Sequence, residues 1–462
     1  MRLPFDLAVQ ATGARVLDAP RAPRDLRVST DTRTLRPGDA FLALRGERFD
    51  GHDYTAQAVA SGACALILDR ESAHVDGVTT LLVSETLAAY MALAGAARER
   101  FSGRVVAITG STGKTTTKSL LAQLLATRYP GRVLEAPGNE NNEIAVSKLL
   151  LAASNDEHDV LIAEMGARRP GDVAALVAIA RPHVGVLTNV GEAHLEIMGS
   201  RATLEETKWA LFSGGARAVL NLADAASCRR APSLERPAHW FFAGDDVPEV
   251  PVGARLCAVI GRRRLVLADE SGGVTELIVD ARLPGEYNRA NLAAALAAAL
   301  DLDASVGALV EAVPSLALPG GRFERIDLAN GPRLIYDAYN ANASGAIAAL
   351  DAFGEEPAPC RIAVLGSMAE LGEESEVLHE RVGAHAAGIV DWLLVGGAFA
   401  AALARGARAA GLPQQRIVPF AANREAAAWL REHAQHEALV LLKGSRKYQL
   451  EEIVEDLGGS LR

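Results

Sequence analysis

The sequence predicts an α/β protein that is built from three domains. Its 462 residues are too many for one ordinary hydrophobic core. Strand-like and helix-like segments alternate through the last third, and a glycine-rich turn joins a strand to a helix near residue 110. Such alternation is typical of parallel sheets that are covered by helices. We expect the three domains to span residues 1–101, 102–314 and 315–462.

The first domain is the smallest, and its pattern predicts an α/β unit. Its strand-like runs are Ala40–Leu44, Ala65–Leu68 and Leu81–Val83. The central domain begins with three further runs, each of which leads into a polar loop: Val105–Thr109, Val160–Glu164 and Val184–Thr188. Ligands of open α/β sheets bind at the carboxyl ends of such strands. Short β segments replace this pattern between residues 238 and 280, where we expect an antiparallel flank.

The last domain has the most regular pattern, which predicts a doubly wound, Rossmann-like sheet. A stretch rich in proline and glycine, Pro314–Gly321, separates it from the central domain. Its strand-like runs are Arg333–Asp337, Arg361–Leu365, Trp392–Val395, Ile417–Phe420 and Leu439–Leu442. Its helical segments are Ala343–Phe353, Glu374–Ala387, Phe399–Ala410, Arg424–Glu432 and Gln449–Leu457.

Composition excludes several classes of function. The formal net charge of −10 argues against general nucleic-acid binding, which depends on lysine and arginine. Four scattered cysteines without a C-x-x-C pair indicate neither a zinc site nor a disulfide scaffold. The amino terminus lacks an apolar signal region, and no uninterrupted apolar stretch reaches 18 residues. We therefore expect a cytoplasmic protein without membrane insertion.

The loop Gly110-Ser111-Thr112-Gly113-Lys114-Thr115-Thr116 carries the strongest functional signal. A glycine-rich turn between a strand and a helix directs backbone N–H groups and the positive helix end at one point. The common phosphate loop has four residues between its glycines, whereas Gly110 and Gly113 enclose two. Gly-Lys-Thr at this joint still predicts that the loop binds ATP or GTP, with Lys114 on the outer phosphates and Thr115 available to magnesium.

Three residues further along the central domain have both a functional and an ordinary interpretation. Glu164 ends a strand beside the phosphate loop, so it is either a magnesium ligand or a surface acid. His194 follows the next strand and is either functional or structural. Lys208 has the pattern of a solvated lysine on a helix face, and residue spacing alone favours that interpretation.

Polar loops on both sides of the domain boundary point to a shared cleft. Asn139 and Asn142 belong to an asparagine-rich loop that either fixes a ligand or forms a polar turn. In the last domain, Arg322 could reach a γ-phosphate and Asp337 could take ribose hydroxyls. The segment 443–447 follows the last strand with cationic side chains that suit an anionic substrate. Together these groups predict an active site between the second and third domains.

Several long motifs in this order resemble those of the Mur ligase family, which builds the peptide stem of bacterial peptidoglycan. The short phosphate loop has the family's form, T-G-(S/T)-x-G-K-T. The other matching motifs are Gly138–Asn142, Glu164–Gly166, Glu192–Glu196, Tyr287–Asn291 and Pro319–Arg322. The resemblance covers essentially the whole chain and implies an ATP-dependent amide ligase with an acyl-phosphate intermediate.

The resemblance also implies roles for individual residues. Those implied for ATP are the loop residues Gly110, Ser111, Thr112, Gly113, Lys114, Thr115 and Thr116, together with Asn291, Arg322 and Asp337. Thr115 and Glu164 would ligate one Mg²⁺ ion, and His194 with a CO2-derived carbamate on Lys208 would ligate a second. Lys114, His194 and Lys208 would be the catalytic residues. Substrate binding is implied for Thr32, Arg33, Asp50, His52, Asn139, Asn142, Lys443 and Ser445.

Four stretches resemble the branch of the family that joins D-alanyl-D-alanine to UDP-N-acetylmuramoyl-tripeptide: Gly46–Asp53, Asp337–Asn342, Gly366–Gly372 and Lys443–Arg446. We expect a monomer that takes these two substrates, with UDP on the first domain. The sibling branch that adds the third stem residue carries an Asp-Asn-Pro-Arg clamp, which this sequence lacks. A folate-polyglutamylating branch lacks the UDP-binding domain, and a nucleotide-switched regulator or motor would need no acceptor. Whether the third stem residue is diaminopimelate or lysine stays open.

Overall fold

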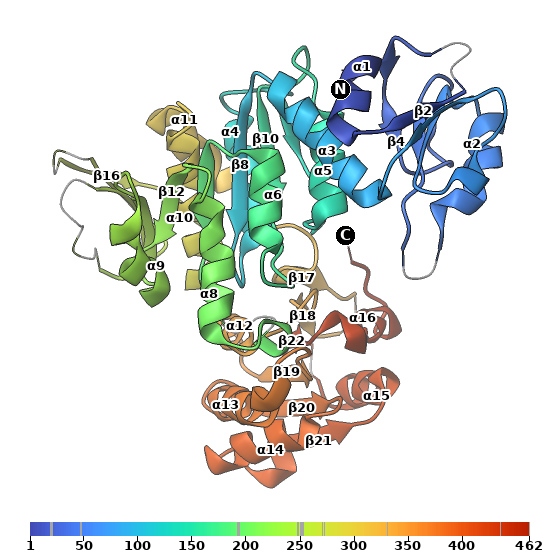
Figure 1. Cartoon of the computed structure of the whole chain (residues 1–462). Coiled ribbons are helices and arrows are strands. Elements are labelled where there is room, and N and C mark those ends of the chain that lie inside the picture. Colours follow the sequence, from blue (N-terminus) through green and yellow to red (C-terminus); the bar gives the residue numbers. More distant parts are fainter. Residues whose placement is uncertain are drawn as a thin grey trace.

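The structure is a computed structural model that describes residues 1–18, 22–46, 49–191, 195–246, 249, 254–269, 271, 273–329, 331–434 and 436–461. Three α/β parts follow one another along the chain, as predicted (Figure 1). The amino-terminal part lies beside the central part, and the carboxyl-terminal part packs below it. In the described residues, no helix has both the length and the apolar character that a membrane crossing requires.

The amino-terminal part contains a five-stranded sheet in the order β2-β7-β6-β5-β4. Every neighbouring pair is parallel except β2 with β7. The strands here are β1 (Leu3–Pro4), β2 (Arg15–Leu17), β3 (Asp25–Leu26), β4 (Val28–Ser29), β5 (Ala40–Leu42), β6 (Ala65–Leu68) and β7 (Thr79–Leu82), of which β1 and β3 form a separate pair. The helices are α1 (Phe5–Thr12), α2 (Thr55–Ala60) and α3 (Thr86–Arg100).

Helix α3 joins the first two parts. Its buried residues Leu93 and Ala97 belong to the same hydrophobic cluster as Leu150 and Val177 of the central part. The predicted boundary at residue 101 therefore falls directly after a helix that packs against both parts. The precise domain limits remain our proposal.

The central part is a nine-stranded sheet in the order β16-β15-β14-β13-β12-β11-β8-β10-β9. Its strands are β8 (Arg104–Thr109), β9 (Val133–Glu135), β10 (Val160–Glu164), β11 (Val184–Leu187), β12 (Arg217–Asn221), β13 (His239–Gly244), β14 (Arg255–Ile260), β15 (Arg264–Ala268) and β16 (Val274–Ile278). Its helices are α4 (Lys114–Leu125), α5 (Glu143–Ala152), α6 (Asp172–Ala180), α7 (Leu195–Met198), α8 (Arg201–Trp209), α9 (Ala225–Arg230), α10 (Glu286–Leu300) and α11 (Val306–Ala312).

The expected antiparallel flank is wrong for its first two strands. Strand β13 pairs in parallel with both β12 and β14, and only β15 and β16 run antiparallel to their neighbours. Helix α9 lies between β12 and β13 and returns the chain, as a parallel connection requires. The chain reverses tightly at Gly261, which has φ of 53° between β14 and β15, and it reverses again between the antiparallel strands β15 and β16.

Alternating residues of β8 build two layers of core. Val106 and Ile108 pack with Leu120 of α4 and with α10, whereas Val105 and Ala107 belong to the cluster that includes α3, α5 and α6. Successive side chains of a strand point to opposite faces of a sheet, so helices can cover both faces. Because β8 pairs in parallel with β10 and β11, the carboxyl ends of these three buried strands lie at the same edge of the sheet.

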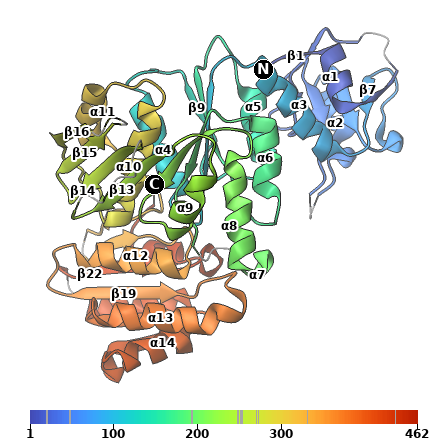
Figure 2. The ribbon, with the colours of Figure 1, turned by 60° about the vertical axis from the view of Figure 1, so that its left-hand side comes forward.

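The carboxyl-terminal part is a six-stranded sheet in the order β17-β18-β22-β19-β20-β21, and its predicted doubly wound pattern is confirmed (Figure 2). Its strands are β17 (Glu324–Asp327), β18 (Arg333–Tyr336), β19 (Arg361–Gly366), β20 (Trp392–Gly396), β21 (Ile417–Phe420) and β22 (Leu439–Lys443). Its helices are α12 (Ala343–Gly354), α13 (Ser375–Ala387), α14 (Ala400–Ala409), α15 (Asn423–His433) and α16 (Glu451–Asp456). Only β17, which the sequence pattern missed, is antiparallel.

Helices α13 and α14 approach closely at two glycines, which yields a stability prediction. A Cβ on Gly406 would lie 1.9 Å from the backbone oxygen of Glu380. We expect Gly406→Ala to lower the free energy of unfolding by about 1–3 kcal/mol, because the helices must separate. Gly307→Ala on α11 is the matched control, since a Cβ there meets nothing within 4 Å. Denaturant unfolding measures both, and equal stability of the two variants would contradict this packing.

Candidate active site

The phosphate loop connects β8 to α4 and is pressed against two neighbouring segments. Gly113 has φ of 83°, and a Cβ there would lie 2.2 Å from Oδ1 of Asn291 on α10. A Cβ on Gly110 would lie 1.9 Å from Oγ1 of Thr188. Close approach therefore requires glycine at both positions.

The loop after β11 holds the phosphate loop in shape. The Ser111 N–H donates to the backbone oxygen of Asn189 at 3.0 Å, and the Thr112 N–H donates to Asn189 Oδ1 at 3.2 Å. Thr188 Oγ1 donates to the Thr112 carbonyl at 2.5 Å. Because these two N–H groups are engaged, the donors left for an anion are those that open α4, which lack partners within the helix. Sequence reasoning missed Thr188 and Asn189.

Lys114 is the cation at the start of α4. Its Nζ donates to the Gly110 carbonyl at 2.9 Å across the loop. Burial lowers the pKa of Lys114, Glu164 opposes that shift, and Arg322 from the carboxyl-terminal part adds to it. An anionic ligand in the loop would restore the charged form, so the fit to a polyphosphate is good.

Glu164 stands at the end of β10 with a side chain that is held at both oxygens. Thr115 Oγ1 donates to Oε2 at 2.9 Å, and Asn141 Nδ2 donates to Oε1 at 2.8 Å. The carboxylate and the hydroxyl are hard oxygen donors of the kind that Mg²⁺ prefers. In the described part of the chain, no three His, Cys, Asp or Glu residues gather as a metal site. A metal here would therefore complete its coordination with ligand oxygens.

The asparagine-rich loop is fixed by a buried lysine. Lys118 Nζ donates to the carbonyls of Ala136 and Gly138, the latter at 2.6 Å. Asn139 and Asn141 line the cleft, although only the former was predicted. Asn142 instead caps α5, because its Oδ1 accepts the Ala145 N–H at 2.9 Å. Asn142 also lines a smaller pocket beside the cleft, and its contact with substrate stays a prediction.

Lys208 of α8 is 1% exposed and lines the cleft, so the interpretation as a solvated lysine is wrong. Burial lowers the pKa of Lys208 well below its usual value, and the charge of Lys114 adds to this shift. A neutral amine is the form that reacts with CO2. No sequence periodicity indicated this burial; the family resemblance alone did. His194, its predicted partner, lies outside the described residues.

The carboxyl-terminal part supplies a buried ion pair. Lys443 Nζ lies 3.0 Å from Asp337 Oδ2, and Asp337 Oδ1 accepts the Phe323 N–H at 3.2 Å. Burial lowers the pKa of Lys443, although Asp337 opposes the shift. Ser445 Oγ accepts the Ala369 N–H at 3.0 Å. The predicted residues Asp337, Lys443 and Ser445 thus form one polar wall.

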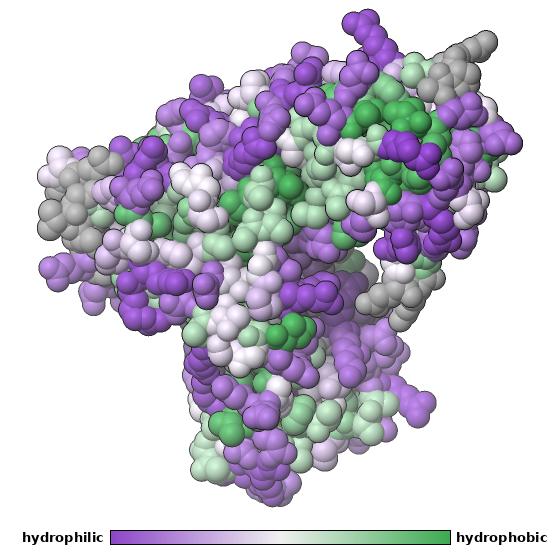
Figure 3. Space-filling model, viewed as in Figure 1, coloured by the Kyte–Doolittle hydropathy of each residue, from purple (hydrophilic) through white to green (hydrophobic). Residues whose placement is uncertain are grey.

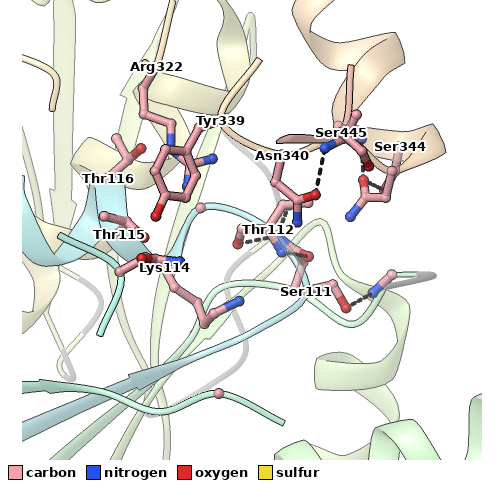
Figure 4. Close-up of a pocket in the computed structure, with 18 of the residues that line it drawn as sticks. Ser111, Thr112, Lys114, Thr115, Thr116, Arg322, Tyr339, Asn340, Ser344 and Ser445 are labelled. Atoms are coloured by element: carbon pink, nitrogen blue, oxygen red, sulfur yellow. Dashed lines mark hydrogen bonds between the residues drawn. The ribbon is translucent and has the colours of Figure 1, made fainter. Parts of the chain in front are cut away.

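Tyr339, which sequence reasoning did not single out, organises two cations. The Arg322 guanidinium carbon lies 4.6 Å from the centre of its ring, and that of Arg446 lies 5.2 Å away. Figure 4 shows Arg322 and Tyr339 beside Lys114, Thr115 and Thr116. Stacking on an aromatic ring orients guanidinium groups that would otherwise be flexible.

These walls enclose one cleft of about 590 Å³ between the central and carboxyl-terminal parts. Figure 3 shows a hydrophilic hollow between these parts. The arrangement is closed, since a Cβ on Gly345 would lie 3.6 Å from Thr112 Cγ2 and one on Gly191 would lie 3.3 Å from Ser344 Oγ. Arg322 and Asp337 line the same cleft as the phosphate loop.

The residues predicted for the UDP moiety lie on the amino-terminal part and do not line this cleft: Thr32, Arg33, Asp50 and His52. His52 is buried, and its ring contacts Asp50 at 2.6 Å and the Asp69 N–H at 3.2 Å. Although burial opposes the effect, hydrogen bonds from His52 and Arg70 hold the pKa of Asp50 below its usual range. His52 thus positions Asp50, and its ring is not exposed for direct contact.

The fold and cleft define a three-domain protein that combines a phosphate loop with a second, Rossmann-like domain. Three family models match it: the Mur ligase family, catalytic domain at residues 27–101, the Mur ligase middle domain at 108–299, and the Mur ligase, glutamate ligase domain at 321–446. The chain belongs to the Mur ligase family.

The similar proteins within the family that are described below are named as the same type of ligase. It is 35% identical to the UDP-N-acetylmuramoyl-tripeptide–D-alanyl-D-alanine ligase of Escherichia coli over 93% of each chain. A crystal structure of MurF from Acinetobacter baumannii matches with a TM-score of 0.86 at 28% identity over 99% of each chain. The MurF ligase of Thermotoga maritima in complex with ADP matches with a TM-score of 0.79 at 29% identity, over 93% of this chain and 96% of that one.

Lys114→Ala should abolish nucleotide-dependent activity while the fold persists. The loop would lose the cation that meets the outer phosphates, and we expect a loss of at least about 100-fold. Lys148→Ala on the exposed face of α5 is the matched control. Nucleotide binding and turnover measured on both pure variants test this, and retained turnover in Lys114→Ala would rule out the assignment.

Proposed function

We propose that this chain joins D-alanyl-D-alanine to UDP-N-acetylmuramoyl-tripeptide with ATP, in the synthesis of peptidoglycan precursors. The observation that carries the proposal is the cleft in which a phosphate loop and the buried Lys208, whose pKa burial lowers, face a polar wall from a second domain. The names of the close relatives support the same substrates. ATP and UDP-linked sugars are cytoplasmic metabolites, so we also propose that the enzyme is cytoplasmic. We further propose that it acts as a monomer.

The reaction needs ATP because a carboxylate is a poor electrophile. The terminal carboxylate of the tripeptide attacks the γ-phosphorus, the bond to the β-phosphate oxygen breaks, and an acyl phosphate and ADP form. The amine of D-alanyl-D-alanine then attacks the acyl carbon, loses a proton and expels phosphate from the tetrahedral intermediate. Lys114 and the N–H groups that open α4 hold the outer phosphates through the first step.

We propose that the central part holds two magnesium ions. Thr115 and Glu164 would hold one, and His194 with carbamylated Lys208 the other. When bound, the ions offset negative charge on the phosphates and on the attacking carboxylate. The neutral form of the Lys208 amine would gain CO2 through a new N–C bond and release one proton, so a buried amine would become an anionic oxygen ligand. Its lowered pKa supports this conversion at neutral pH.

The remaining predicted residues divide between the substrates. We assign Asn291, Arg322 and Asp337 to ATP, because all three line the cleft beside the phosphate loop. Asn139, Lys443 and Ser445 line the same cleft and suit the anionic peptide. Thr32, Arg33 and Asp50 are assigned to the uridine diphosphate on the amino-terminal part.

An acceptor panel separates this function from its rivals. We expect phosphate release only when UDP-N-acetylmuramoyl-tripeptide and D-alanyl-D-alanine are both present with ATP, and a product of matching mass. The sibling ligase would instead extend a UDP-linked dipeptide with a single amino acid. A folate-type ligase would use no UDP substrate, and a nucleotide switch would hydrolyse ATP without any acceptor.

Lys208→Ala should lose activity by about tenfold or more while it keeps its fold. The variant lacks the oxygen ligand that the carbamate supplies. Acetate should restore part of the activity, because it can occupy the vacated space and present oxygens to the metal. Activity measured with and without acetate tests this, with chloride at equal ionic strength as the control.

Lys208→Arg should fail although it retains the positive charge, because a guanidinium does not take up CO2 in this way. A variant as active as the wild type would show that the carbamate is not needed. A high-resolution map with a bare Lys208 amine beside two bound magnesium ions would show the same.

Substrates can enter only if the closed cleft opens, so the chain should change shape in solution. We expect the radius of gyration from small-angle X-ray scattering to fall when a non-hydrolysable ATP analogue and UDP-N-acetylmuramoyl-tripeptide are added together. The cause is the contact that forms between the phosphate loop and residues 344–345. An unchanged scattering curve would count against closure.

A further inference from the structure

A smaller pocket of about 180 Å³ adjoins the main cleft. The two cavities share Asn141, Gly166 and Arg168 among their lining residues. Asn141 also donates to Glu164, at the place where the reacting carboxylate would meet the metal. The pocket therefore adjoins the part of the cleft where the reacting end of the tripeptide would lie.

Two arginines line this pocket without partners. Within the part of the chain that the structure describes, neither Arg168 nor Arg169 has an ion pair or a hydrogen bond from its guanidinium. Asp172, the nearest carboxylate in the lining, instead accepts their backbone N–H groups at 2.9 and 2.8 Å. That carboxylate shapes the loop and leaves both guanidinium groups available to an anion.

The rest of the lining suits a ligand side chain that ends in both an ammonium and a carboxylate group. Glu143, the first residue of α5, lines the pocket, and its carboxylate has no ion pair in the described residues. Leu176 of α6 is 2% exposed and supplies an apolar contact for methylene groups. An ammonium beside Glu143 and a carboxylate beside the arginines would together match an amino-acid terminus.

On the basis of the proposed function, we propose that this pocket receives the far end of the third stem residue, and that this residue is diaminopimelate. Arg168 and Arg169 bind its distal carboxylate, and Glu143 binds its distal ammonium. Lysine carries the ammonium but no carboxylate at that end. A lysine side chain would therefore leave both arginines unpaired and place its cation beside them.

Steady-state kinetics with two UDP-N-acetylmuramoyl-tripeptides, one with diaminopimelate and one with lysine, test this directly. We expect the wild type to prefer the diaminopimelate substrate by about tenfold or more in kcat/KM. The double variant Arg168→Ala/Arg169→Ala should lose that preference through KM, with the lysine substrate changed by less than about twofold. Glu143→Gln should weaken both substrates alike, because both carry the distal ammonium.

Arg424→Ala is the matched control, since Arg424 is exposed on α15 and its helix lies in the other domain. Equal loss of both substrates in the double variant would overturn the proposal, because the arginines would then serve a carboxylate that both tripeptides share. An unselective wild type or an unaffected double variant would also overturn it.

Calorimetric binding of the two UDP-tripeptides without ATP separates this inference from the proposed function. If the wild type ligates neither tripeptide, the proposed ligase function is wrong. A binding preference for the diaminopimelate substrate that disappears in the double variant would still support the proposed role of the pocket. Absence of that preference in binding overturns the pocket even when ligation succeeds with both substrates.

Discussion

The site depends on the carboxylate of Glu164, which ties two loops to the end of one strand. The hydroxyl of Thr115 and the amide of Asn141 both donate to it, so the phosphate loop and the asparagine-rich loop are placed relative to each other. The parallel register of β8 and β10 brings these loops to the same sheet edge. If the carboxylate moved, the metal position, the nucleotide and the entrance to the side pocket would all shift together.

The cleft concentrates cations in a chain whose net charge is −10. Burial lowers the pKa of Lys114, Lys208 and Lys443, because each amine loses part of its hydration. Such desolvation is unfavourable until an opposite charge arrives. In the proposed reaction, phosphates and carboxylates would supply that charge at Lys114 and Lys443, and a carbamate would turn the group at Lys208 into an anion. Substrate binding and closure are therefore linked, because closure completes the desolvation.

Much of the fold was predictable because long buried strands are apolar along their whole length. The five predicted strands of the last domain are confirmed, whereas β17 has the mixed sequence Glu-Arg-Ile-Asp and gave no such signal. The parallel direction of β13 depends on a crossover through α9, which a run of short β segments does not reveal. In the site, the glycine and lysine motifs could be recognised in the sequence. The contacts of Asn141, Asn189 and Tyr339 join residues that are far apart in the chain, so local patterns did not predict them. The burial of Lys208 likewise depends on tertiary packing around α8.

The carboxyl ends of the strands in the central sheet face the carboxyl ends of the strands in the carboxyl-terminal sheet. This arrangement explains why the site lies between the two sheets. Ligands of α/β sheets bind at carboxyl ends of strands. Glu164 ends β10 in one sheet, and Asp337 and Lys443 stand at the ends of β18 and β22 in the other. Helix α8 crosses this boundary, because Arg201 at its start pairs with Glu374 at 3.1 Å while Lys208 at its end lines the cleft. Helix α8 thus connects the position of the carboxyl-terminal part to the position of Lys208. If Lys208 ligates a metal as we propose, a ligand set that is complete only after closure would confine phosphoryl transfer to the closed state.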